Sequence, residues 1–144
     1  MWHTISYSHF PCAPSEAFPE GHVSARPVVP LTLIHRDNRI SCYAIIDSGA
    51  DFCTFPLVFA VHLGLDPRQA KRFSTAGIGS LSVPAFLWDV TVDLRGIAQF
   101  PLQAGFSQGL DHLGVGLLGQ RGFFQRFKVA FDLPKEVFQI EVEG

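Results

Sequence analysis

Short runs in which apolar and polar residues alternate, separated by turns, constrain this chain more than any other feature. From Trp88 to Leu94 a polar residue follows each apolar one. A period of two is typical of a strand with one face on a core. Arg95-Gly96 then turns the chain into a second apolar run at 97–102. This part of the chain is therefore predicted to be β-structure.

Two hairpins are predicted elsewhere. Residues 28–46 contain two β-rich runs joined by the polar turn Arg36-Asp37-Asn38-Arg39. Pro30 lies in the first run and favours an edge position, because proline cannot donate a ladder hydrogen bond. Residues 128–142 contain two alternating runs joined by the turn Leu133-Pro134-Lys135-Glu136. Each run is as long as a strand and too short for a typical helix.

Helical signals are few. Pro56 and Gly64 flank a segment that predicts a short helix at 56–63. The chain has 144 residues, 47% of them apolar and 17% charged, which suffices for one core. We predict an all-β fold, a small closed barrel with one or two short helices. A group of aromatic residues is interpreted as core on a short helix and a strand, not as a cofactor site: Phe123, Phe124, Phe127 and Phe131.

The first 26 residues differ from the rest in their proline content and in their lack of periodicity. They contain Pro11, Pro14 and Pro19 and little sustained periodicity. We interpret residues 1–26 as an N-terminal extension or arm, with one strand near residues 5–9. The domain itself is predicted to comprise residues 27–144.

Composition argues against several classes of protein. With a net charge of −2 and no basic run, the chain is not expected to bind nucleic acid. The longest apolar stretch, residues 55–65, is shorter than the ~20 residues of a membrane span. The start of the chain lacks the pattern of a secretory signal, and three cysteines without CxxC spacing are typical of free thiols. We therefore expect a cytoplasmic protein that does not associate with membranes.

Several apparent motifs fail on their context. Residues 114–119 match GxGxxG, but no βαβ unit surrounds them, so a dinucleotide site is not predicted. The six histidines form no ligand pair, and no metal or other cofactor is expected. No GxSxG elbow is present, and Cys53 has no local signature of a nucleophile.

The remaining candidate is Asp47-Ser48-Gly49. As a tripeptide it is ordinary turn chemistry. However, the apolar run 43–46 leads directly into it, which predicts a carboxylate at a semi-buried strand end. Burying an isolated charge is costly, so such a carboxylate has to find a partner or change its protonation. This makes Asp47 the leading candidate for a functional residue.

Three segments in order resemble the retropepsin-like aspartic proteases of bacterial type, single-lobe relatives of pepsin. They are the apolar run into Asp-Ser-Gly-Ala at 45–50, the glycine-flanked Ala76-Gly77-Ile78-Gly79, and Leu117-Leu118-Gly119 followed by a short helix. The resemblance covers roughly residues 27–142 and implies a closed barrel with a flap hairpin. Many relatives carry an acidic residue or an Arg-Asn/Asp pair after the last glycine, whereas here Gln120-Arg121 follows.

The resemblance implies an aspartic endopeptidase whose two catalytic aspartates activate a water. Because the chain has one Asp-Ser-Gly and is too short for two lobes, it implies a homodimer with an extended peptide or protein as substrate. An alternative with the same fold is a dimerising peptide-binding module with little or no proteolysis. The expected site comprises catalytic Asp47, Ser48 and Gly49, substrate-binding Ala50, Ala76, Gly77, Ile78 and Gly79, and supporting Leu117, Leu118 and Gly119. Asp51 is interpreted as a turn or surface residue.

Overall fold

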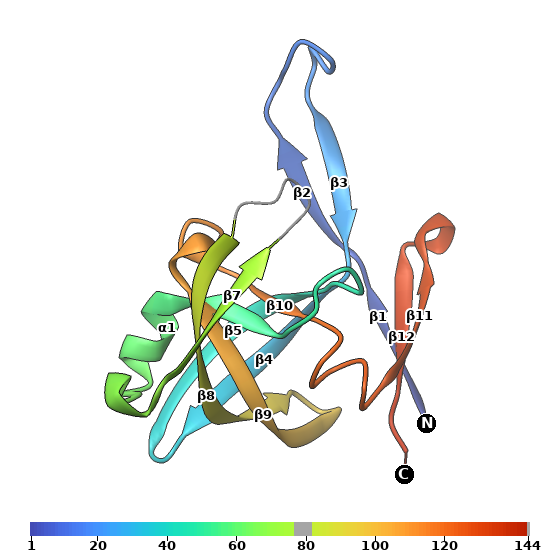
Figure 1. The fold of residues 1–144 in the computed structure, drawn as a ribbon. Coiled ribbons are helices and arrows are strands. Elements are labelled where there is room, and N and C mark those ends of the chain that lie inside the picture. The colour runs from blue at the N-terminus through green and yellow to red at the C-terminus, as the bar shows by residue number, and fades with distance from the viewer. Residues whose placement is uncertain (77–81, 144) are drawn as a thin grey trace.

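The structure is a computed structural model that describes residues 1–76 and 82–143, and it consists mainly of β-strands (Figure 1). The barrel strands and the strand beside them are β4 (Val28–His35), β5 (Asn38–Ile46), β6 (Thr54–Pro56), β7 (Lys71–Ala76), β8 (Ser82–Leu94), β9 (Ala98–Ser107) and β10 (Gly116–Leu118). The other strands are β1 (Trp2–Ser6), β2 (Ser8–Cys12), β3 (His22–Arg26), β11 (Lys128–Asp132) and β12 (Val137–Glu141). Helical elements are α1 (Leu57–His62) and the 3₁₀ turns Pro67–Gln69, Gln108–Leu110 and Leu133–Lys135.

Six strands form a closed barrel in the order β4-β5-β10-β6-β9-β8, with β4 pairing back to β8. The seventh strand, β7, extends the sheet beyond β8 as a hairpin partner. The predicted all-β class and small closed barrel are confirmed. Pro30 lies in the half of β4 that pairs only with β5, whereas Thr32–Ile34 pair with both β5 and β8. Pro30 therefore lies where β4 has a neighbouring strand on one side only, so the absence of its N–H breaks no hydrogen bond to a second strand.

Alternating side chains of the barrel strands fill its interior. On β4, Val29, Leu31 and Leu33 are at most 1% exposed, and Phe55 and Phe106 are fully buried beside them. A fully buried side chain of this kind contributes about 1.5–3 kcal/mol to folding. These residues belong to one continuous core.

The predicted helix at 56–63 is confirmed as α1. Pro56 is its N-cap, and Gly64 follows the helix with a φ of +67°, a conformation that glycine adopts without strain. The helix packs against β5 and β9 (Figure 1). None of the helices within the described ranges has the length and apolarity needed to cross a bilayer.

The N-terminal region contains three strands, so the expectation of one strand near residues 5–9 is corrected. β1 pairs with β12, which pairs with β11, and these three form a separate sheet. From this sheet Phe138 and Ile140 enter the core of the barrel. The break between β1 and β2 falls at Tyr7, whose N–H donates to Glu136 O at 2.9 Å. The division of the chain at residue 26 stays a prediction.

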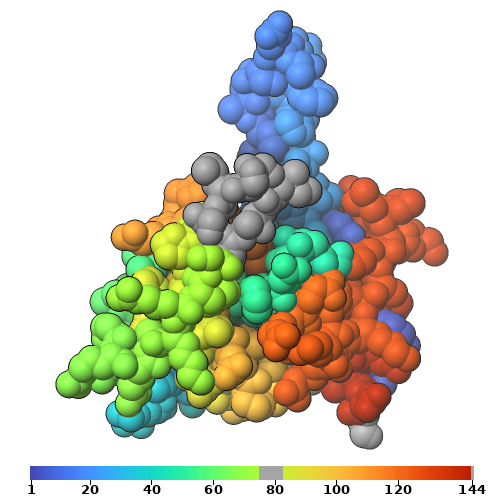
Figure 2. Space-filling view, viewed as in Figure 1, coloured from blue at the N-terminus to red at the C-terminus, as the bar shows by residue number. Residues whose placement is uncertain are grey.

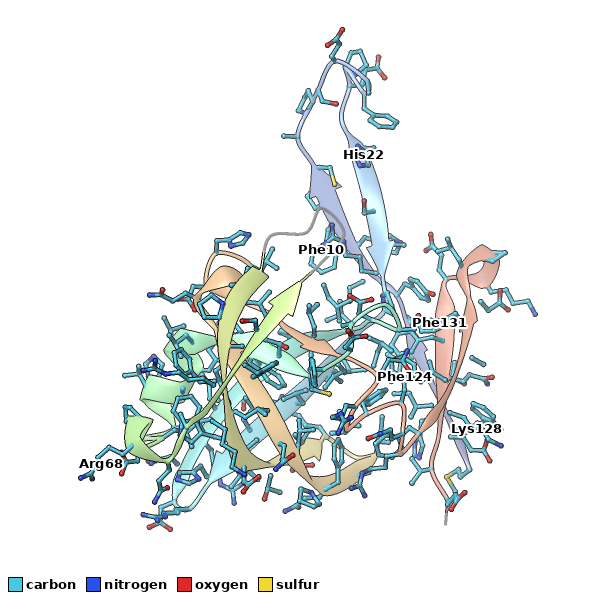
Figure 3. The ribbon with its side chains drawn as sticks, in the orientation of Figure 1. Phe10, His22, Arg68, Phe124, Lys128 and Phe131 are labelled. Carbon is cyan, nitrogen blue, oxygen red and sulfur yellow. The ribbon has the colours of Figure 1, made fainter. Side chains whose placement is uncertain are left out.

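The hairpin of β2 and β3 projects from the body of the molecule (Figure 2). From here on, the word arm refers only to residues 8–26, the part of the N-terminal extension that projects. Phe10 lies on β2 and His22 on β3 (Figure 3), and Phe18 is 52% exposed. In addition to the β2–β3 ladder, Arg26 lies over the Phe10 ring, and Phe18 packs on His22.

The segment after Gly119 is a series of turns, so the short helix expected there is corrected. Gly122 has a φ of +98°, which no helix interior permits. Phe123 and Phe127 are buried, as the core interpretation predicted. Phe131 is 45% exposed, and for this residue that interpretation is wrong. In Figure 3, Phe131 lies on the strand that follows the turns, β11.

Candidate active site

Asp47 follows directly on the last residue of β5. Ile46 is 3% exposed, and Asp47 is half-buried beside it. The Asp47 N–H donates to Leu118 O at 3.0 Å, which continues the parallel pairing of β5 with β10. The carboxylate therefore emerges where two adjacent parallel strands end. This is the semi-buried strand end that the sequence predicts.

A tight turn orients the carboxylate. The Gly49 N–H donates to Asp47 Oδ1 at 2.9 Å, and the Ala50 N–H donates to Asp47 O at 3.1 Å. The side chain thus bonds the backbone two residues on, as aspartates do in turns. Ser48 and Gly49 are exposed, and Ala50 is half-buried. Part of Asp47 therefore remains exposed at the surface of the protomer.

The end of β10 supports this turn. Leu118 is fully buried and Leu117 is half-buried. A Cβ on Gly119 would lie 2.5 Å from Ala50 O and 2.4 Å from Phe52 O, so a larger residue does not fit without movement. The structure therefore brings the candidate turn and the three supporting residues together.

Residues 120 and 121 also bind the segment that contains the turn. The Gln120 N–H donates to Ala50 O at 2.8 Å, and the Arg121 N–H donates to Asp51 O at 2.9 Å. The Gln120 side-chain amide donates a hydrogen bond to Ser48 O. Sequence reasoning noted Gln120 only as a departure from the family pattern. Its position immediately after Leu-Leu-Gly was the one signal that it would reach the turn.

Cys53 lies beneath the site and is fully buried. The Cys53 thiol contacts Arg121 O at 3.4 Å. Burial raises the pKa of this thiol to about 11, although hydrogen bonds to backbone groups lower the pKa in part. A thiol with such a pKa stays neutral near pH 7 and is a poor nucleophile. Its environment fits a packing role for Cys53.

The root of the expected flap lies close to the turn region. β7 and β8 form a hairpin in which Ala76 pairs with Ser82. The ring of Phe52 packs edge-on against Phe73 of β7, with centroids 4.9 Å apart. The predicted substrate-binding residues Gly77, Ile78 and Gly79 lie outside the described residues.

The GxGxxG match at residues 114–119 has a structural explanation. Gly116–Leu118 is strand β10, and a Cβ on Gly116 would lie 2.3 Å from the Phe55 ring. The pattern therefore reflects close packing in a barrel. Within residues 1–76 and 82–143, no three His, Cys, Asp or Glu side chains are grouped so that they could hold a metal ion.

Comparisons with known proteins show a likeness in structure but no match in sequence. A scan against family models and a search of curated protein sequences both find no match. Among solved structures, the chain is similar to a retropepsin-like aspartic protease from Rickettsia conorii, with a TM-score of 0.57 and 19% sequence identity. The superposition covers 99% of this chain and 96% of that one. The chain therefore has a small all-β fold of the retropepsin-like type.

Proposed function

We propose that this protein is an aspartic endopeptidase that acts as a homodimer, with Asp47 of each protomer in a shared site. One observation carries the proposal. A half-buried aspartate stands on an Asp-Ser-Gly turn at the end of β5, and its carboxylate accepts the Gly49 N–H at 2.9 Å. The fold that holds this turn is similar to that of a retropepsin-like aspartic protease.

The chemistry follows from bringing two such carboxylates together. Two carboxylates a few ångströms apart hold one proton between them, because like charges oppose the ionisation of both. The ionised carboxylate takes a proton from a bound water, whose oxygen attacks the peptide carbonyl carbon. The protonated carboxyl group donates to the carbonyl oxygen. Collapse of the tetrahedral adduct transfers a proton to the leaving amine and breaks the C–N bond.

The proposed substrate is an extended peptide. Such a peptide would add as a strand between the β7–β8 hairpin and the turn that contains Asp47. Backbone hydrogen bonds would supply affinity in this arrangement, and side-chain pockets would supply preference. Ala50, which is half-buried in the turn, would form part of the floor.

The test is Asp47→Asn, which keeps the shape of the side chain and removes its charge. We expect turnover of a peptide library to fall by about 10³-fold or more, because the general base is lost. The matched control is Asp51→Asn, four residues further on. Asp51 is exposed and contacts Arg121 through its backbone carbonyl, so this variant should keep wild-type turnover.

Two results would contradict the proposal. One is unchanged cleavage by purified Asp47→Asn protein, once contamination by proteases of the expression host has been excluded. The other is a wild-type protein that binds library peptides and cleaves none of them. The second result would favour the alternative, a dimerising peptide-binding module.

A further inference from the structure

The peptide unit between Ser48 and Gly49 is hydrogen-bonded at both ends. Its carbonyl oxygen accepts from the Gln120 side-chain amide, and its N–H donates to Asp47 Oδ1 at 2.9 Å. A peptide unit is planar, so its C=O and N–H point in opposite directions and turn together. The bond from Gln120 therefore acts on the same rigid group that holds the carboxylate.

The backbone of Gln120 is itself fixed on both sides. Its N–H donates to Ala50 O at 2.8 Å, and its carbonyl oxygen accepts from the Gln125 N–H at 3.1 Å. The side chain starts from a fixed point and loses less freedom when it binds the turn. Because the partner is a carbonyl oxygen, the side-chain group facing it has to be a donor.

We infer that Gln120 is a positioning residue for the candidate catalytic aspartate. It holds the plane of the Ser48–Gly49 peptide so that the Gly49 N–H stays directed at Asp47 Oδ1. Hydrogen bonds in a chain also polarise one another, so a donor on Ser48 O strengthens the Gly49 N–H as a donor. The catalytic consequence rests on the proposed function, whereas the orientation of the turn does not.

The residue type at position 120 matters in this account. Glutamine brings a neutral N–H donor to Ser48 O. Glutamate has nearly the same shape but, when ionised, offers only acceptors, so it would face another acceptor. Ser48 is exposed, so its carbonyl would turn toward water instead, and the Gly49 N–H would turn away from Asp47.

The test compares Gln120→Glu with two other variants. Gln120→Lys restores an N–H donor at the same position. Gln125→Glu adds the same negative charge in the same loop, and its carboxylate can still accept the bond that the Gly122 N–H donates to Gln125 Oε1 at 3.1 Å. Turnover is measured as kcat and KM separately. The orientation of the turn is measured from the NMR resonances of the Gly49 amide proton and the Ser48 carbonyl carbon.

For Gln120→Glu we expect kcat to fall about 10-fold with little change in KM or Tm, the size of one lost hydrogen bond. The Gly49 amide proton should move upfield. Gln120→Lys should recover most of kcat, and Gln125→Glu should match the wild type. An unchanged Gly49 resonance in Gln120→Glu would overturn the inference. So would a Lys variant as slow as the Glu variant, or a Gln125→Glu variant equally slow.

Failure of the proposed function can be told apart from failure of this inference. If the wild-type protein cleaves no peptide, the proposed function fails and the NMR comparison still decides the role of Gln120 in the turn. An upfield shift of the Gly49 amide in Gln120→Glu alone would then support the positioning role. Equal shifts in Gln120→Glu and Gln125→Glu would remove it.

Discussion

The turn that carries Asp47 is held by neutral hydrogen bonds from the backbone and from one amide side chain, that of Gln120 on Ser48 O. The turn itself supplies the Gly49 N–H, and Leu118 supplies the carbonyl that fixes the Asp47 backbone. The ion pairs found within residues 1–76 and 82–143 lie elsewhere, for example between Arg68 and Asp66. The turn that carries Asp47 is therefore held by its own backbone, by β10 and by the side chain of Gln120.

A buried cysteine, Cys42, makes the stability of the protein depend on pH. Burial raises the pKa of Cys42 to about 12, with Arg95 acting in the opposite direction, whereas an unfolded thiol titrates near ~8.5. Between these values the folded chain holds a proton that the unfolded chain releases. The free energy of unfolding therefore falls as pH rises through this window, and the contribution is fully present below it.

We predict that Cys42→Ala reduces this loss of stability at alkaline pH. Between pH 8 and pH 10.5 the variant should lose about 1–2 kcal/mol less stability than the wild type, measured by urea unfolding at both values. Val29→Ala is the packing control, because Val29 is 1% exposed and carries no titratable group. The same loss in wild type and Cys42→Ala would show that the thiol ionises equally in both states.

At the scale of elements, the arm and β1 have different roles. The arm begins and ends with a register pair, Ser8 and Arg26, so its two ends lie side by side at its base. It contacts the rest of the chain through the His9–Glu136 pair at 2.7 Å, in which both side chains are about half exposed. Exposed pairs contribute at most about 1 kcal/mol. β1, in contrast, pairs along its whole length with β12.

We predict that replacing residues 8–26 with a short Gly-Ser linker leaves the barrel folded. Tm should change by a few degrees at most, because little buried contact is lost. Deleting residues 1–7 should lower Tm much further, since it removes the β1–β12 ladder and the Ile5 side chain that packs on the core. A linker variant that unfolds or aggregates at room temperature would show that the arm is part of the folding unit.

The elements differ in how far the sequence could predict them. Hairpins such as 28–46 were predictable because alternation and turn residues are local signals. The pairing of β10 with β5 joins segments some 70 residues apart, which periodicity cannot reveal. The family resemblance implied only that Leu117, Leu118 and Gly119 support the turn. The prediction of a helix after Gly119 was wrong because the positive φ of Gly122 interrupts helical geometry. β2 was missed because prolines are tolerated in a two-stranded hairpin, where one edge needs no partner.

The same limit applies to the candidate site. Asp47 was found because an apolar run leads into Asp-Ser-Gly, a feature of consecutive residues. The bond from Gln120 to Ser48 O spans 72 positions and depends on the three-dimensional approach of two loops. Its side chain carries no charge and matches no motif. Apart from its place directly after Leu-Leu-Gly, nothing in the sequence pattern distinguished it from an ordinary surface glutamine.

For the whole molecule, the central consequence is that one protomer supplies half of the proposed site. The chain contains one Asp-Ser-Gly, and the barrel forms one lobe. The β1–β12 pairing holds the two ends of the chain together, with the Met1 amino group donating to Val142 O at 3.0 Å. Under the proposed function, the second catalytic carboxylate would come from another copy of the chain, and the proposed site would lie on a two-fold axis.

Mixing wild-type and Asp47→Asn chains tests this claim most directly. The two proteins are combined at equal concentration, allowed to exchange subunits at high dilution and then reconcentrated, and turnover per wild-type chain is measured. If both Asp47 residues are needed in one site, random pairing should reduce that turnover to about half, and a larger excess of mutant should reduce it further. Turnover per wild-type chain that stays constant at every ratio, with exchange shown by mass-labelled subunits, would contradict the shared site.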